Sequence, residues 1–217
     1  MFSLPLHSNL YCMSKKIFII ILGSISILAL ILLLQNPKKK ESAEKQKPMD
    51  LNRHSEAFNA SIGLVVQEYL NLKDAFVIGD TIKIKTHTSA LIAALDAIDS
   101  TELKKDSAVL LETFKMSVMD VKSNVQSLLT QSDLTDMRRD FSSLTTVMYP
   151  SFFNSIGYEG PKLYLQECPM AFNDTETANW ISNSSEIINP YLGNNHPKYK
   201  AGMLHCGELK DSITSKK

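Results

Sequence analysis

The chain has 217 residues, of which 44% are apolar and 21% are charged, and its formal net charge is zero. The first 50 residues carry seven lysines against three acidic residues, so the rest of the chain has a net charge of −4. A mildly acidic domain is a poor electrostatic match for phosphate backbones, and we expect no nucleic-acid binding. The length is sufficient for one domain with an apolar core.

Residues 17–34, IFIIILGSISILALILLL, contain no charged side chain and are flanked by lysines on both sides. As a helix they would span about 27 Å, the thickness of a hydrocarbon core. We therefore predict a transmembrane signal anchor at 17–34, with a tail at 1–16 and a charged linker at 35–54. Small residues typical of a cleavage site are missing after the apolar run, but a cleaved signal peptide stays open as the alternative.

Four amphipathic segments follow, each with apolar residues three or four positions apart. Gly79 is expected to end the first helix, and Pro150 is expected to kink or end the fourth. Four helices joined by short connections favour an antiparallel bundle over residues 55–157. The stripes are formed by Phe58, Ile62, Val65, Tyr69, Leu72 and Phe76; by Ile84, Leu91, Ala94 or Leu95, and Ile98; by Leu110, Phe114, Val118, Val121, Val125 and Leu128; and by Leu134, Met137, Phe141, Leu144, Met148 and Phe152.

Residues 158–217 differ in character, because short alternating segments are separated by turns rich in Asn, Gly and Pro. The alternation predicts strands at 162–168, 178–183 and 202–209. The predicted fold class is therefore mainly α: a transmembrane helix, a four-helix bundle, and a small C-terminal appendix of loops or a β-hairpin in the same domain.

Two Cys–Met pairs lie in this appendix. Cys168 and Met170 are two residues apart and would point the same way in an extended segment. Met203 and Cys206 would converge if the chain made a single turn there. Thiolates and thioethers are soft ligands that select Cu(I) over harder ions, and these four residues are the predicted metal site.

Other interpretations of the same residues stay open. Two cysteines in an oxidising compartment are also typical of a disulfide, here Cys168–Cys206, that closes a loop-rich segment. His205 is a further candidate ligand, although it would point away from Cys206 in an extended chain. His87 is another, but a histidine on an apolar helix stripe is more often bonded to a neighbouring helix.

Several segments resemble a bacterial domain of unknown function, over about residues 55–210. They are YLQECPMAFND (164–174), ANWISNSSEIINPYLG (178–193) and MLHCGEL (203–209), with VQEYLNLKDAFVIGD (66–80) and RRDFSSLTTVM (138–148) similar to its helical part. That domain occurs alone on exported proteins or fused to the periplasmic membrane-fusion subunits of heavy-metal efflux systems. The chain departs from it by an insertion, NNHPKYKAG (194–202), and by the histidine at position 205.

The resemblance implies a role in copper handling, with Cys168, Met170, Met203 and Cys206 as the ion's ligands. Together with the predicted anchor, whose short tail precedes a large C-terminal domain, we expect a single-pass protein of the bacterial inner membrane with its C-terminal domain in the periplasm or extracytoplasmic space. We expect a Cu(I)-binding protein that serves as a chaperone, a sensor or an accessory to heavy-metal efflux, with a copper-transfer or efflux protein as partner. The alternative is a helical interaction module that docks to an envelope complex without metal. No acid–base pair or catalytic motif is present in the sequence, and we do not expect an enzyme.

Overall fold

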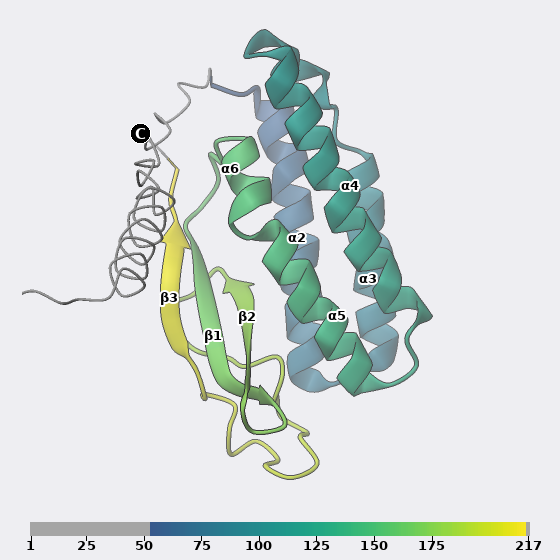
Figure 1. The fold of residues 1–217 in the computed structure, drawn as a ribbon, viewed down its shortest axis with the longest axis vertical. Helices are drawn as coiled ribbons and strands as arrows, with labels where there is room; N and C mark the ends of the chain where they lie inside the picture. The colour runs from purple at the N-terminus through teal and green to yellow at the C-terminus, as the bar shows by residue number, and fades with distance from the viewer. Residues whose placement is uncertain (1–52, 216–217) are drawn as a thin grey trace, which may run out of the picture. The chain divides into compact units, whose positions relative to one another are not determined.

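The computed structural model describes residues 53–215, which form a mainly helical protein with one small three-stranded sheet (Figure 1). The mainly helical class predicted from the sequence is thereby confirmed. The predicted tail, the predicted transmembrane segment at 17–34 and nearly all of the linker lie outside the described residues. Between residues 53 and 215, no helix combines the length and the apolar character needed to cross a membrane.

Four long helices, α2 to α5, make up nearly half of this part of the chain (Figure 1). The side chain of the residue just before each helix accepts a hydrogen bond from a first-turn N–H, which satisfies donors that a helix start leaves free. Gly79 ends the first of them in the left-handed conformation, with φ 76°, as the sequence predicts. Their bounds are Glu56–Ile78, Thr81–Asp96, Ala108–Thr130 and Leu134–Val147.

Three short helical pieces complete the helical part: η1 (Ser100–Lys105), η2 (Met148–Phe152) and α6 (Phe153–Ser155). The regular helix α5 ends at Val147, and Tyr149, which precedes Pro150, has a non-helical φ of −108° and ψ of 127°. This confirms the predicted interruption, because the residue before a proline is pushed out of the helical region.

The sheet contains β1 (Leu163–Phe172), β2 (Glu176–Ser182) and β3 (Glu208–Ile213) in the order β2-β1-β3, with both pairs antiparallel. The third strand predicted at 202–209 was misplaced, since residues 201–205 form turns and the strand begins at Glu208. The Cys206 N–H donates to the Met203 carbonyl (3.0 Å) and closes a turn there.

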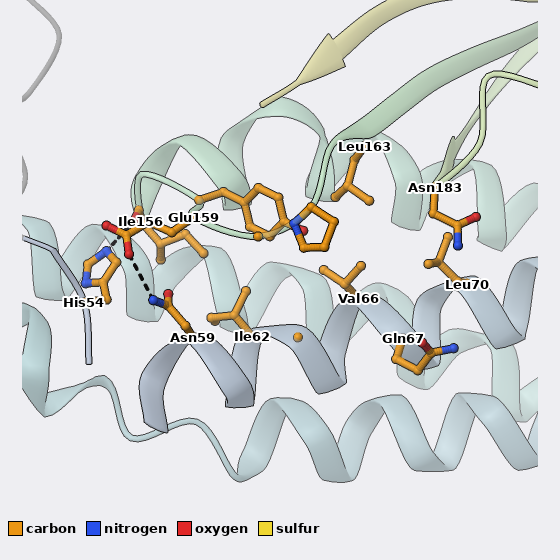
Figure 2. Close-up of a pocket in the computed structure, with 14 residues that line it drawn as sticks. His54, Asn59, Ile62, Val66, Gln67, Leu70, Ile156, Glu159, Leu163 and Asn183 are labelled. Carbon is orange, nitrogen blue, oxygen red and sulfur yellow. Dashed lines mark hydrogen bonds between the residues drawn. The ribbon is translucent and has the colours of Figure 1, made fainter. Parts of the chain in front are cut away.

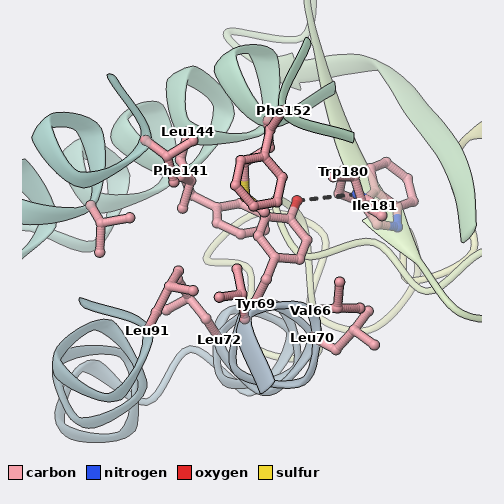
Figure 3. Close-up of a cluster of buried hydrophobic side chains, with 14 of the residues drawn as sticks. Val66, Tyr69, Leu70, Leu72, Leu91, Phe141, Leu144, Phe152, Trp180 and Ile181 are labelled. Atoms are coloured by element: carbon pink, nitrogen blue, oxygen red, sulfur yellow. Dashed lines mark hydrogen bonds between the residues drawn. The ribbon is translucent and has the colours of Figure 1, made fainter. Parts of the chain in front are cut away.

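The sheet shares its hydrophobic core with the helices. In Figure 1 the strands lie beside α2 and α5, while α3 and α4 lie on the other side of the helical layer. Figure 3 shows Trp180 and Ile181 of the sheet together with Tyr69, Phe141 and Phe152 of the helical part, and all five side chains are buried. Residues 158–215 are therefore packed onto the helices through side chains rather than held only by the chain connection.

One buried hydroxyl joins the two parts directly. Tyr69 on α2 shares a hydrogen bond with Thr145 Oγ1 on α5 (2.6 Å) and accepts another from the Ile181 N–H on β2 (3.1 Å; Figure 3). Its side chain is 1% exposed, and burial raises its pKa. A backbone N–H buried without a partner costs free energy. The Tyr69 hydroxyl therefore stabilises the sheet, by accepting from the Ile181 N–H, as well as the contact between α2 and α5.

We predict that Tyr69→Phe destabilises the protein by about 2 kcal/mol, because the Ile181 N–H would stay buried without an acceptor. The midpoint of thermal unfolding should fall by about 4–8 °C. The midpoint would be measured by circular dichroism on heating, for Tyr69→Phe and for the control Tyr164→Phe.

Tyr164 is partly exposed, and its ring lies 4.7 Å from the Lys162 Nζ rather than in the core. Its change to phenylalanine should alter stability by less than about 0.5 kcal/mol. Equal effects of the two substitutions would contradict the role assigned to the Tyr69 hydroxyl.

Candidate functional site

The two cysteines of the C-terminal part lie side by side. Cys168 Sγ and Cys206 Sγ are 3.8 Å apart, and both thiols are free. The two residues are 38 positions apart in the sequence, and the fold brings them together on β1 and on the turn that precedes β3.

Cys168 occupies the better shielded position of the pair. It is opposite Ala178 in the β1–β2 ladder, and the register shifts immediately after it, so that the next paired residue is Phe172. The side chain is fully buried. Burial raises the pKa of the Cys168 thiol to about 11, although hydrogen bonds from the Met170 N–H and the Asn189 side chain act in the opposite direction.

Cys206 is partly exposed and follows the turn that begins at residue 201. Gly207, the next residue, has φ 148°, which favours glycine. A Cβ atom at this position would come within 2.7 Å of the Glu167 carbonyl oxygen and 2.9 Å of Trp180 Cη2. The Cys-Gly sequence therefore allows the chain to approach β1 closely enough to bring the second sulfur to the first.

The predicted methionine ligands take different places near this pair. Met170 lies in β1 between Cys168 and Phe172, where the pairing with β2 shifts register. Met203 lies one turn before Cys206, and its carbonyl accepts a hydrogen bond from the Cys206 N–H. Both methionines are partly buried against the hydrophobic core.

The two histidine candidates are bonded elsewhere. His205 is exposed, and its Nδ1 lies 2.8 Å from the Ile187 carbonyl oxygen. His87 on α3 lies 3.0 Å from Glu68 Oε2 on the neighbouring helix α2. In the part of the chain that the structure describes, no group of three or more His, Cys, Asp and Glu side chains is arranged to hold a metal ion.

Asn189 is a residue of this site that the sequence analysis did not single out. Its Nδ2 donates to the Cys206 carbonyl (2.7 Å), and hydrogen bonding by its side chain acts to lower the pKa of the Cys168 thiol. The only signal in the sequence is the Asn-Pro pair at 189–190, which indicates a turn but not what the turn contacts.

A separate pocket of about 240 Å³ lies between α2 and the segment 156–163 (Figure 2). Its floor is apolar, with Ile62, Val66 and Leu163 among the lining residues, and a hydrogen bond joins Asn59 Nδ2 to Glu159 Oε2 (2.9 Å) at one end. Neither cysteine lines this pocket. It is thus distinct from the candidate site.

Comparison with known proteins identifies one family. Residues 65–155 match a family described as "Protein of unknown function (DUF3347)", so a domain of this kind is present in the chain. The matched segment begins within α2 and ends at α6, before β1, and therefore contains neither Cys168 nor Cys206. No curated protein and no solved structure is significantly similar to the chain. The predicted resemblance to a domain of unknown function is confirmed at this level.

We predict that a thiol reagent distinguishes the two cysteines. In reduced, folded protein at pH 8, iodoacetamide should modify Cys206 at least about tenfold faster than Cys168. Cys206 is partly exposed, whereas Cys168 is buried and almost entirely protonated at this pH. Peptide mapping by mass spectrometry would give the two rates separately.

The same experiment in denaturant provides the control, since unfolding should make the two rates nearly equal. Faster modification of Cys168 in the folded protein would contradict the burial described for it.

Proposed function

We propose that this protein binds Cu(I) through the thiolates of Cys168 and Cys206, with Met170 and Met203 as thioether ligands. The observation that carries the proposal is the 3.8 Å separation of the two free sulfurs. Two sulfurs bound to one ion at about 2.3 Å with a tetrahedral angle would lie about 3.8 Å apart, taking the metal–sulfur distance of zinc sites as a guide. The pair could hold one ion with little movement of the backbone.

The chemistry of the available side chains favours a soft ion. Thiolate and thioether sulfur prefer Cu(I) to Mg(II) or Ca(II), and thioether sulfur is not among the usual ligands of zinc. The partly buried positions of Met170 and Met203, each in the segment that carries one of the cysteines, are compatible with a ligand role. Binding would displace the Cys168 proton, because the thiolate is the metal ligand.

The protein would act at the bacterial cell envelope. The apolar segment 17–34 would anchor it in the bacterial inner membrane, with the described domain in the periplasm. There it would accept Cu(I) and pass it by ligand exchange to a copper-transfer or heavy-metal efflux protein, without catalytic turnover. A buried first thiol beside a partly exposed second thiol would retain the ion while leaving one ligand accessible to a partner.

The test is an anaerobic competition for Cu(I) between the protein and a colorimetric chelator. The full-length chain should carry Cys12→Ser, so that Cys168 and Cys206 are the only cysteines left. We expect one equivalent of Cu(I) to be held by the reduced protein. Binding should be lost in Cys168→Ser/Cys206→Ser and after oxidation of the thiols, since a disulfide cannot supply thiolates.

A pair of methionine variants tests the thioether ligands. Met170→Leu/Met203→Leu should weaken Cu(I) binding about tenfold or more, while Met116→Leu/Met119→Leu should leave it unchanged. The second pair is the matched control, because Met116 and Met119 are exposed on α4, 59% and 69% respectively, and lie outside the candidate site. A reduced wild-type protein that fails to compete with the chelator would overturn the proposal.

A second candidate function is supported by the surface of α4. Val109, Met116 and Met119 are exposed and lie on one side of this helix, which is the kind of apolar surface that a protein partner can cover. In that case Cys168 and Cys206 would form a disulfide that stabilises the C-terminal part, and copper would not be bound. The double cysteine variant would then lose stability but not partner binding.

A further inference from the structure

We infer that Asn189 is a positioning residue, which holds the Cys206 segment beside Cys168, close enough for the two sulfurs to share a ligand or, after a side-chain movement, to form a disulfide. The inference deepens the proposed function, because it concerns the same cysteine pair. It does not depend on copper, since the proximity of the two thiols can be measured without any metal.

All the hydrogen-bonding groups of Asn189 are used, and the residue is fully buried. Its Oδ1 accepts from the N–H groups of Tyr191 (2.8 Å) and Leu192 (3.0 Å), which forms the turn after Asn189. Its carbonyl accepts from the Gly193 N–H (2.9 Å). These three bonds fix the conformation of its own loop.

The remaining groups of Asn189 reach the cysteine segment. Its backbone N–H donates to the Leu204 carbonyl (2.8 Å), and its Nδ2 donates to the Cys206 carbonyl (2.7 Å). The main chain on both sides of His205 is therefore bonded to one residue, so the turn that carries Cys206 cannot move away without breaking two partly shielded hydrogen bonds.

The loop around Asn189 is itself attached to the helices. Arg138 on α5 donates from Nε to the Pro190 carbonyl (3.2 Å), and the Asn194 N–H donates to the Val77 carbonyl at the end of α2 (2.8 Å). Burial lowers the pKa of the Arg138 guanidinium to about 10, so it stays charged at neutral pH. Cys206 is thus positioned from the helical core, through this loop, by Asn189.

The two ends of the Asn189 side chain have separable roles, and this makes the inference testable. Asn189→Asp keeps an oxygen that can accept from the Tyr191 and Leu192 N–H groups. It removes the amide N–H that binds the Cys206 carbonyl, and it places a carboxylate oxygen beside that carbonyl and the Cys168 thiol. The substitution should preserve the loop while releasing the cysteine segment.

The experiment measures the effective concentration of the two thiols in the full-length chain carrying Cys12→Ser. The protein is equilibrated with mixtures of reduced and oxidised glutathione under denaturant-free conditions. Two protein thiols lose two protons and two electrons to form the Cys168–Cys206 disulfide, while one glutathione disulfide is reduced to two glutathione thiols. Alkylation and mass spectrometry measure the ratio of reduced to oxidised protein in each mixture, and the effective concentration of the two thiols follows from this ratio and that of glutathione.

We expect Asn189→Asp to lower the effective concentration about tenfold. Asn194→Asp is the matched control, because it introduces the same charge into the same loop at an exposed side chain, and it should change the value less than twofold. A merely structural role would destabilise the reduced and oxidised forms equally, so it would lower the melting temperature and leave this ratio unchanged.

An effective concentration in Asn189→Asp equal to that of the parent would overturn the inference. Should this variant fail to fold, Asn189→Ser replaces it, because a serine oxygen can also accept from the following turn but is too short to reach the Cys206 carbonyl. The outcome is independent of the copper titration. A lowered effective concentration in a protein that binds no Cu(I) would support the role of Asn189 and reject only the proposed function.

Discussion

The arrangement of this protein depends on the contact between its helices and the sheet that covers α2 and α5. A three-stranded sheet with an exposed edge strand has little core of its own, and here its apolar residues are buried against the helices. The Tyr69 hydroxyl makes this contact specific, because it bonds Thr145 on one helix and the Ile181 N–H on the sheet. A packed aromatic cluster surrounds it, so the strands have one favourable position on the helices (Figure 3).

The position of the cysteine pair follows from that contact. Cys168 belongs to β1, whose place is set by pairing with β2 and by packing on the helices. Cys206 is brought to it by a loop that Arg138 and the end of α2 hold from the other direction. Two independent attachments to the same helical layer therefore determine how far apart the sulfurs lie. The separation is set by the backbone positions of the two cysteines and not by their side-chain rotamers alone.

The sequence predicts the helices well and the C-terminal part only in outline. Helix stripes such as Phe58 to Phe76 are local patterns, and Gly79 and Pro150 mark ends through their own backbone preferences, so neighbouring residues are sufficient evidence. The start of β3 could not be predicted in the same way. The turn before it is held by Asn189, which is distant in the sequence, and β3 is mostly exposed, so buried and exposed residues do not alternate along it. The meeting of Cys168 and Cys206 was a hypothesis that spacing alone could not decide, since it depends on contacts between residues far apart in the chain.

Trp180 gives this arrangement a further property. It is the only tryptophan in the chain, it is fully buried, and its ring lies against Gly207, the residue next to Cys206. Indole emission responds to solvent, to neighbouring sulfur and to bound metal ions, and no second tryptophan obscures that response. The protein therefore contains an intrinsic fluorescent reporter beside its cysteine pair, which can follow events there in real time without a label.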